Sequence, residues 1–434
     1  MKDNMRIKIV LTMITMLVMT SITQAVEIEV GEDSININGQ LQLHGSLEGV
    51  DDPYNNSERL FLFLRQARLS VNGDVNNVEY EVEWMMGGEE VPENNSVMSL
   101  LDAYINIPIQ DDAFGVKLGQ FKVPYGRERL LDSGNAYNVN RSIGNNFFNI
   151  GRDVGVALHK EEGLFSGALG MFTGGGINIP ERYIPEDIGV PMFITRFGIN
   201  NGLDEDVFTP AGYDGPKDRE GCAVYLNLMY NKDSRVGHST PLNVKYFDKS
   251  LILNSDWNPY VAARGEKSEF YQIGADAAWQ TALTEESSLL MSAEAHLSSF
   301  DNNQGGIENS GGTIAANVIK DNCSFGVRYA VVDPDAKMAY TKTVEENGAD
   351  VKKVFPITSD LIHEIAPSFV YSLKDYNVKL IAELSYQMDV PVSIEKGNGV
   401  YNLMRQPDQV SYASNEGIEL QDNYLASLIV QFNF

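Results

Sequence analysis

Residues 424–434, YLASLIVQFNF, alternate strictly between two kinds of side chain. One phase is wholly apolar and consists of Tyr424, Ala426, Leu428, Val430, Phe432 and Phe434. The other phase is mixed and consists of Leu425, Ser427, Ile429, Gln431 and Asn433. Successive side chains of a β-strand point to opposite faces, so this pattern predicts a strand with one apolar and one partly polar face.

Residues 78–84, VEYEVEW, show the same alternation with charged residues on one phase. The apolar phase is Val78, Tyr80, Val82 and Trp84, and the other is Glu79, Glu81 and Glu83. An apolar face of this kind suits the core of a soluble β-sandwich or the lipid side of a membrane barrel. The spacing of the connections between strands distinguishes these two folds.

Short and long connections alternate along the chain. Short turns are predicted near 73–77, 110–114, 161–163, 231–236, 284–286, 320–321 and 374–375. Longer loops are predicted near 46–59, 87–98, 124–150, 174–220, 251–268, 300–311, 333–360 and 389–422. These fifteen connections imply about sixteen strands. An even strand number, short periplasmic turns and long extracellular loops are typical of an all-β, transmembrane antiparallel β-barrel of the bacterial outer membrane.

The first 25 residues have the features of an export signal. Lys2, Arg6 and Lys8 precede a mainly apolar run from Ile9 to Ile22, and Ala25 ends the segment. The run is shorter than the ~20 residues that a membrane-spanning helix needs. We therefore predict a cleaved signal peptide over residues 1–25 and a single barrel domain over residues 26–434.

The chain is strongly acidic, with a formal net charge of −27. This charge disfavours binding of nucleic acid or anionic lipid over a broad surface. The mean hydropathy of −0.21 is still compatible with a membrane barrel, because only every second strand residue has to be apolar.

Two cysteines, Cys222 and Cys323, are too few for a disulfide framework. In the predicted strand order Cys222 begins a strand after a long loop, whereas Cys323 begins one after a short turn. We therefore expect them at opposite ends of the barrel.

Residues 117–173, KLGQFKVPYGRERLLDSGNAYNVNRSIGNNFFNIGRDVGVALHKEEGLFSGALGMFT, resemble the phosphate-selective porin O/P family of bacterial outer-membrane porins. LRQARLSVNGDV at 64–75 and LLDAYI at 100–105 extend the resemblance, although Gln66 stands where the family has a second arginine. The resemblance implies a homotrimer, embedded in outer-membrane lipid and lipopolysaccharide, through which small hydrophilic solutes diffuse without a cofactor. Anions such as phosphate are one class of such solutes.

Six cations lie between Lys117 and Arg152 against two acids, Glu128 and Asp132. Residues 124–150 are the third long loop, which in trimeric porins of this size commonly folds inward to narrow the pore. We predict that the pore-lining cations are Lys117, Lys122, Arg127, Arg129, Arg141 and, from the neighbouring motif, Arg68. Cations at a narrow, partly dehydrated passage would raise the local concentration of anions.

Strand phase adds two expectations about this region. A bulge near Gly119 and Gln120 would turn both Lys117 and Lys122 inward, whereas Arg152 shares its phase with apolar residues and is expected at a rim. The alternative role of these cations is structural: they would pair with Glu128, Asp132 and Asp153 and fix the loop. The two roles are compatible.

The carboxylates of VEYEVEW are expected to face the lumen, near Arg68 and near Asp102 of the next strand. Unpaired, Glu79, Glu81, Glu83 and Asp102 would repel anions, whereas paired with arginines they would form a structural ladder. We favour the paired arrangement.

Two other functions are compatible with the strand pattern. One is a surface adhesin or structural barrel whose acidic loops are its working parts. The other is a barrel-embedded hydrolase, which the sequence disfavours because it has no G-x-S-x-G elbow and its five histidines lack metal-type spacing. We accordingly predict neither a catalytic site nor a metal site.

Overall fold

The computed structural model describes most of the chain after residue 25. The described ranges are 26–30, 33–49, 58–86, 98–109, 113–148, 150–160, 163–174, 176, 190–213, 220–232, 251–253, 269–302, 305–335, 338–346, 349–356, 361–373, 377–395, 399–402 and 418–434. The predicted signal peptide lies outside these ranges.

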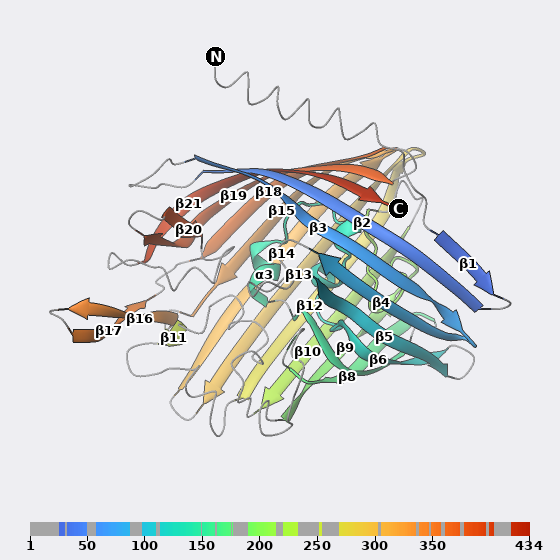
Figure 1. The fold of residues 1–434 in the computed structure, drawn as a ribbon, viewed down its shortest axis with the longest axis horizontal. Helices are drawn as coiled ribbons and strands as arrows, with labels where there is room; N and C mark the ends of the chain where they lie inside the picture. Colours follow the sequence, from blue (N-terminus) through green and yellow to red (C-terminus); the bar gives the residue numbers. More distant parts are fainter. Residues whose placement is uncertain are drawn as a thin grey trace, which may run out of the picture.

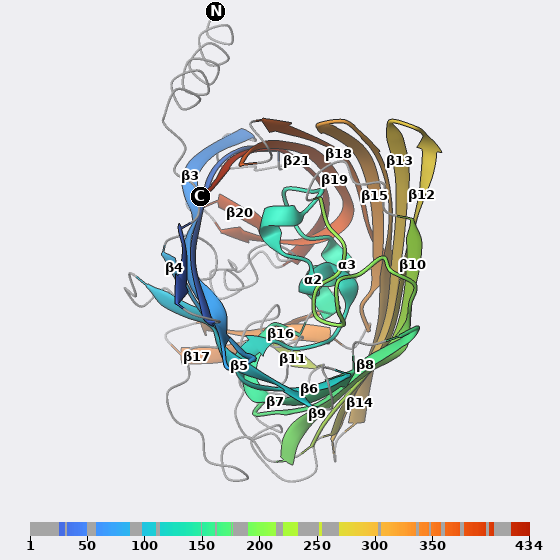
Figure 2. The ribbon, with the colours of Figure 1, turned by 90° about the vertical axis from the view of Figure 1, so that its right-hand side faces the viewer.

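Sixteen of the described strands form one closed antiparallel ring (Figures 1 and 2). In order around the ring they are β2 (Asp33–Gly49), β3 (Glu58–Val75), β4 (Val78–Met86), β5 (Ser99–Ile109), β6 (Phe114–Lys122), β7 (Arg152–Lys160), β8 (Phe165–Phe172), β9 (Val190–Asn200), β10 (Gly221–Lys232), β12 (Glu269–Thr284), β13 (Ser287–Asn302), β14 (Gly305–Lys320), β15 (Cys323–Asp333), β18 (Ile362–Leu373), β19 (Val378–Glu395) and β21 (Ile418–Asn433). Two short strands, β1 (Val26–Val30) and β20 (Gly399–Asn402), pair antiparallel with the ends of β2 and β19. The prediction of a sixteen-stranded antiparallel barrel is confirmed.

The ring closes where the terminal strand meets the first long one. The register of β21 with β2 runs from Tyr424 opposite Gly49 to Asn433 opposite Gln40. Beyond it, the backbone N–H of Phe434 donates to the carbonyl of Gly39 at 2.9 Å. Closure leaves no strand edge unpaired in the ring, which a barrel wall in lipid requires.

The two faces of the wall carry the predicted side chains. Large apolar residues point outward and are well exposed, among them Leu297, Ile314, Phe325 and Leu384. Inward positions are polar and buried by the contents of the barrel, for example Gln42, His44, Ser46 and Glu48 of β2 and Asn423, Ser427 and Gln431 of β21. The wall is therefore apolar outside the ring; its inward face is polar along β2 and β21 but apolar where Phe172, Met192 and Ile194 join a buried cluster inside the ring.

Turn chemistry agrees with the short connections. Asn76 and Asn77 join β3 to β4 with φ angles of 52° and 63°, the conformation of a two-residue hairpin turn that asparagine tolerates. Asp321, with φ 47°, opens the turn between β14 and β15. Among the described residues, no helix is both long enough and apolar enough to cross a membrane.

Three further strands lie outside the ring. β11 (Leu251–Leu253), β16 (Met338–Glu346) and β17 (Ala349–Pro356) form a separate antiparallel sheet. β16 and β17 lie within the connection between β15 and β18, which the sequence predicts as a long loop at 333–360.

Three predicted connections are wrong. The long loop predicted at 300–311 falls largely on β13 and β14, which pair up to Asn302 opposite Gly305. The loop predicted at 174–220 contains β9, which pairs with both β8 and β10. The short turn predicted at 231–236 would lead to another strand of the ring, but β10 pairs directly with β12, which begins at Glu269. The extra strand and the missing one cancel in the count of sixteen. The strand that the predicted turn would imply falls on residues 237–250, outside the described ranges.

The cysteine prediction fails for the same reason. Insertion of β9 reverses the direction of β10, so Cys222 and Cys323 both begin strands that start at the turn end of the barrel. The two thiols are free.

The outward face offers a stability test. Ile314 is 58% exposed in the middle of β14, between Ala293 and Tyr329 of the neighbouring strands. Replacing Ile314 by Arg should lower the free energy of unfolding by about 2–4 kcal/mol, because a charge would enter the hydrocarbon layer near its midplane. Urea unfolding in lipid vesicles measures this change. Ile314→Val, which keeps the apolar face, should cost about 1 kcal/mol or less; an equal loss in both variants would contradict the assignment of this face to lipid.

Candidate functional site

Residues 123–151, between β6 and β7, cross the interior of the barrel. Their helices, α2 (Arg127–Leu130) and α3 (Ile143–Phe148), and the short 3-10 turn η1 (Ser133–Asn135) lie within the ring of strands (Figure 2). Apolar side chains of this segment, including Tyr125, Ile143 and Phe147, are almost fully buried. The segment therefore packs inside the barrel as part of its core.

Polar side chains of the wall hold this segment through its backbone. Donors from strands around the ring bond its carbonyl groups: Arg65 bonds Val139, Gln272 bonds Phe148 at 2.7 Å, Arg328 bonds Asn140 at 2.7 Å, Lys379 bonds Gly134 at 2.8 Å and Gln431 bonds Gly134 at 3.0 Å. Much of this segment is irregular, so these wall donors satisfy carbonyls that a helix or sheet would otherwise satisfy.

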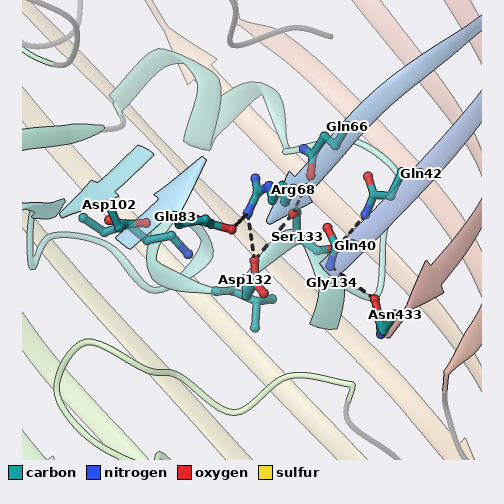
Figure 3. Close-up of polar contacts among 12 residues, drawn as sticks. Gln40, Gln42, Gln66, Arg68, Glu83, Asp102, Asp132, Ser133, Gly134 and Asn433 are labelled. Carbon is teal, nitrogen blue, oxygen red and sulfur yellow. Dashed lines mark hydrogen bonds and ion pairs between the residues drawn. The ribbon is translucent and has the colours of Figure 1, made fainter. Parts of the chain in front are cut away.

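Arg68 of β3 connects the wall to this segment (Figure 3). Its guanidinium lies 3.4 Å from the carboxylate of Glu83 and 3.3 Å from that of Asp132. Beside it, Gln66 accepts a hydrogen bond from the hydroxyl of Ser133 at 3.1 Å. Arg68 is thus an interior cation paired with carboxylates.

Arg152 completes a second bridge to the same carboxylates. It donates to Asp102 at 2.8 Å and to Glu83 at 3.3 Å, and it is buried. The prediction that Arg152 sits at a rim is wrong: β7 begins at this residue, and its side chain turns toward the interior despite sharing its phase with outward residues. The ion pairs with Asp102 and Glu83 stabilise this inward position of Arg152.

The other two glutamates of VEYEVEW have neutral partners. Glu81 accepts a hydrogen bond from the hydroxyl of Tyr104 at 2.7 Å, and Glu79 accepts one from the amide of Asn106 at 2.9 Å. The carboxylate row therefore changes character along β4, from ion pairs at Glu83 to neutral hydrogen bonds at Glu79.

Lys117 and Arg127 meet residues of a second interior segment, 201–213. The guanidinium of Arg127 forms two bonds with the carboxylate of Asp204, at 2.7 and 2.6 Å, and both side chains are buried. The ammonium of Lys117 lies 3.7 Å from the ring centroid of Tyr104 and 4.7 Å from that of Phe208.

The remaining predicted cations lie along residues 122–141. Lys122 donates to the carbonyl of Leu130 at 2.9 Å, and Arg141 donates to that of Leu131 at 2.6 Å. Arg129 lies in α2 and is partly exposed. The structure thus brings all six predicted cations and the four predicted carboxylates to the interior segments or the strands that face them.

The predicted bulge is displaced to the neighbouring strand. The pairing of β6 with β5 and β7 is regular, so a bulge at Gly119 and Gln120 is wrong. The register shift lies between β4 and β5 after Glu83, where the amide of Gln120 donates to the carbonyls of Leu100 and Leu101 at 2.7 and 2.8 Å. Gly119 has a φ of 130°, and a Cβ there would lie 2.2 Å from the carbonyl oxygen of Ala103.

Two buried charge clusters were not predicted from the sequence. Arg196 of β9 forms a bidentate pair with Asp276 of β12 and also bonds Asn227 at 2.8 Å. Arg328 of β15 bonds Glu364 at 2.7 Å and lies 3.8 Å from Glu383. Arg328 could have been found from the sequence, because it is an arginine on the inward phase of a predicted strand. Arg196 could not, because its strand, β9, was not predicted.

A polar cavity of about 590 Å³ remains between residues 132–135 and the wall. Its charged lining consists of Arg68, Glu81, Glu83 and Asp132, and its neutral lining includes Gln40 and Asn433. Figure 3 shows Arg68, Glu83 and Asp132 beside Gln40 and Asn433. Of these carboxylates, Glu83 also pairs with Arg152, and Lys122 and Arg152 act on Asp132 together with Arg68. Among the described residues, no group of three or more His, Cys, Asp or Glu side chains is placed to hold a metal ion.

The pKa of Asp132 lies below its ordinary value of 3.8. Burial within the barrel opposes ionisation, but Lys122, Arg68 and Arg152 outweigh it. The side chain is 49% exposed to the cavity, so the surrounding cations, rather than burial, decide the direction of the shift.

Glu128 shows the opposite behaviour. Burial raises the pKa of its carboxyl, although Arg328 lies 3.5 Å away and Ser142 donates to it through both its backbone N–H and its hydroxyl. Glu128 therefore fixes the turn before α3 by hydrogen bonds as well as by its charge.

Comparison with known proteins agrees with this architecture. Residues 35–179 match the family model described as phosphate-selective porin O and P, which confirms the predicted resemblance over this part of the chain. The matched range contains β3 to β8 and the whole interior segment 123–151. Among curated proteins, none matches the chain.

Several solved structures share the fold. An anion-selective porin from Comamonas acidovorans is 13% identical, with a TM-score of 0.57 over 93% of this chain and 100% of that one. OmpT, an outer membrane protein of Vibrio cholerae, is 12% identical, with a TM-score of 0.51 over 94% and 99%. The outer membrane channel DcaP of Acinetobacter baumannii is 11% identical, with a TM-score of 0.51 over 94% and 99%. The chain has the fold of outer-membrane porins.

The low pKa of Asp132 generates a pH prediction. A carboxyl whose pKa is lower in the folded than in the unfolded state stabilises the fold at pH values above its unfolded pKa, and this contribution declines as the pH falls toward the folded pKa. The difference in free energy of unfolding between wild type and Asp132→Asn should therefore be constant above about pH 5 and shrink below about pH 4. Urea unfolding across pH 2–7 measures it; a difference that grows on acidification would contradict the pairing of Asp132 with Arg68.

Proposed function

We propose that this chain is an outer-membrane porin through which small hydrophilic solutes diffuse passively down their gradient. The observation that carries the proposal is the closed ring with an apolar outer face, a polar interior and a polar cavity of about 590 Å³ beside the interior segment. A closed barrel with a polar lumen can cross lipid and hold water at the same time.

We propose anions such as phosphate as the first solutes to test. The matched family is described as phosphate-selective, and one structural neighbour is described as anion-selective. Lys117, Lys122, Arg127, Arg129, Arg141 and Arg68 would form the cationic side of the narrowest part, which residues 123–151 would create. Glu79, Glu81, Glu83 and Asp102 would form its acidic side.

The same resemblance supports a homotrimer in the outer membrane, surrounded by its lipid and lipopolysaccharide. The apolar outer face of β3, which includes Leu60, Leu62 and Leu64, is well exposed in the single chain and is suited to lipid or to a second copy. The mass of the purified protein in detergent distinguishes a trimer from a monomer.

Single-channel recording under a KCl gradient tests the proposed function. Purified wild-type protein in a planar bilayer should open discrete channels, and added phosphate should alter the current if phosphate occupies the pore. Absence of any conductance would overturn the porin proposal. A cation-selective reversal potential would overturn the preference for anions.

Lys122 provides the variant for this recording. Replacing Lys122 by Glu should shift the reversal potential toward cations, because the negative charge would enter the interior segment beside Leu130. Lys320→Glu is the matched control, since it makes the same charge change on an exposed residue at the turn between β14 and β15. Equal shifts in the two variants, or none in either, would remove Lys122 from the narrow part.

A further inference from the structure

The connection between β9 and β10 is long, although it lies at the end of the barrel where the other connections are short turns. Ile199, at the end of β9, pairs with Phe165, which follows the short turn between β7 and β8. The connection therefore leaves from the end that carries the short turns, yet it runs from residue 201 to 220 before β10 begins. Porin-like barrels have short periplasmic turns at this end, so its length calls for a structural reason.

The described part of this connection, residues 201–213, folds into the barrel. Figure 2 shows its green trace inside the ring, beside α2 and α3. Leu203, Val207 and Tyr213 are almost completely buried. The backbone N–H of Tyr213 donates to the carbonyl of Asn135 at 2.7 Å, and the ammonium of Lys379 bonds the carbonyl of Tyr213 at 2.8 Å.

Local hydrogen bonds give the segment a fixed shape. Asn200 accepts from the backbone N–H groups of Leu203 and Asp204, and Asp206 accepts from those of Phe208 and Thr209. A Cβ at Gly212 would lie 2.6 Å from the carbonyl oxygen of Asn135, so glycine permits the close approach of the two interior segments. The segment is held in place by its own turns and by contact with residues 123–151.

Asp204 places a carboxylate directly on Arg127. The pair is bidentate, and the side chains of Arg127 and Asp204 are 6% and 1% exposed. Asp204 also accepts from the backbone N–H of Ala211 at 2.9 Å. A buried bidentate pair of this kind cancels most of the field that the arginine would otherwise project into the lumen.

Phe208 restrains Lys117 through a different kind of contact, without a counter-charge. Its ring lies 4.7 Å from the ammonium of Lys117, which the rings of Tyr104 and Phe121 flank at 3.7 and 5.4 Å. Phe208 also packs against Phe121 and His159. Aromatic faces attract a cation and exclude water from it, so Lys117 is restrained against the wall.

We infer that segment 201–213 determines the charge selectivity of the channel by its action on two cations: Asp204 neutralises Arg127, and Phe208 holds Lys117 against the wall. The inference rests on the proposed porin function and adds the element that sets its selectivity. The segment enters from the turn end and meets residues 123–151 inside the barrel, so it acts on the cations from the side opposite to the long loops.

Asp204→Asn tests the neutralisation of Arg127. In single-channel recording under a KCl gradient, this variant should shift the reversal potential toward the chloride equilibrium potential, because Arg127 loses its counter-charge. Glu205→Gln is the matched control: it removes the same charge from the neighbouring residue, whose side chain is exposed, and should shift the potential less. Equal shifts would show a general charge effect and overturn the specific neutralisation of Arg127.

Two further variants guard against misfolding of Asp204→Asn, in which a buried arginine loses an ionic partner. Phe208→Leu keeps an apolar side chain but removes the ring over Lys117. Replacement of residues 203–211 by a short Gly-Ser linker removes both Asp204 and Phe208. Both variants should shift the potential toward chloride, and the linker variant should also have a larger conductance.

The outcomes separate the two proposals. A wild-type protein that forms no channels overturns the proposed function and the inference with it. A wild type that conducts, with folded linker and Phe208→Leu variants that keep its conductance and reversal potential, overturns the inference alone. Heat-modifiable mobility of each variant on gels verifies that the barrel has folded.

Discussion

Backbone hydrogen bonding across the junction of β21 and β2 is the constraint on which the rest of the structure depends. In lipid, an unpaired N–H or C=O group costs several kcal/mol, so a sheet that spans the membrane has to close. The ten consecutive register pairs from Gly49 and Tyr424 to Gln40 and Asn433 achieve this closure. Once the ring is closed, every strand has one face toward lipid and one toward the interior, and the alternation of YLASLIVQFNF and VEYEVEW follows.

Closure also creates an interior in which buried backbone groups need hydrogen-bond partners. Residues 123–151 bring into this space many backbone carbonyls that are not bonded within a helix or sheet. Long cationic and amide side chains of the wall donate to them, such as Lys379 to Gly134 and Arg328 to Asn140. Much of the positive charge inside the barrel is thereby bound to backbone or carboxylate oxygens. The formal charge of the region consequently overstates the field that a solute would meet.

The sequence predicted those parts of the fold that depend on alternation and on local turn chemistry. The terminal strand, β4 and the sixteen-strand count follow from period-two patterns and turn residues. β9 escaped prediction because apolar residues lie on both of its faces: Met192 and Ile194 are buried against the interior, on the same face as Arg196, while Phe193 and Phe197 face outward. Its inward residues pack against the interior of the barrel rather than against water, so the alternation that marks the other strands is absent.

The candidate site was predictable in its residue types but not in its pairings. Motif and phase indicated Arg68, Lys117, Lys122 and Arg127, because cations are rare in this acidic chain. Asp204 could not be assigned to Arg127, since the pair joins segments 77 residues apart and depends on an inward turn that the sequence did not indicate. The same holds for Phe208 and Lys117, whose contact exists only once β9 is placed.

The three carboxylates of VEYEVEW have different kinds of partner along the barrel wall. Glu83 is paired with Arg68 and Arg152, Glu81 accepts from the neutral hydroxyl of Tyr104, and Glu79, nearest the turn end, accepts from the neutral amide of Asn106. A hydrogen bond from a neutral donor stabilises a carboxylate but leaves its charge in place. The carboxylates with neutral partners therefore lie toward the turn end, at the level of Lys117, whereas Lys122 and Arg68 lie nearer the level of Glu83, so the field changes along the wall. A solute that crosses the interior meets this change, and the pairing of each charge, rather than the number of charges, decides how strong the field is at each level.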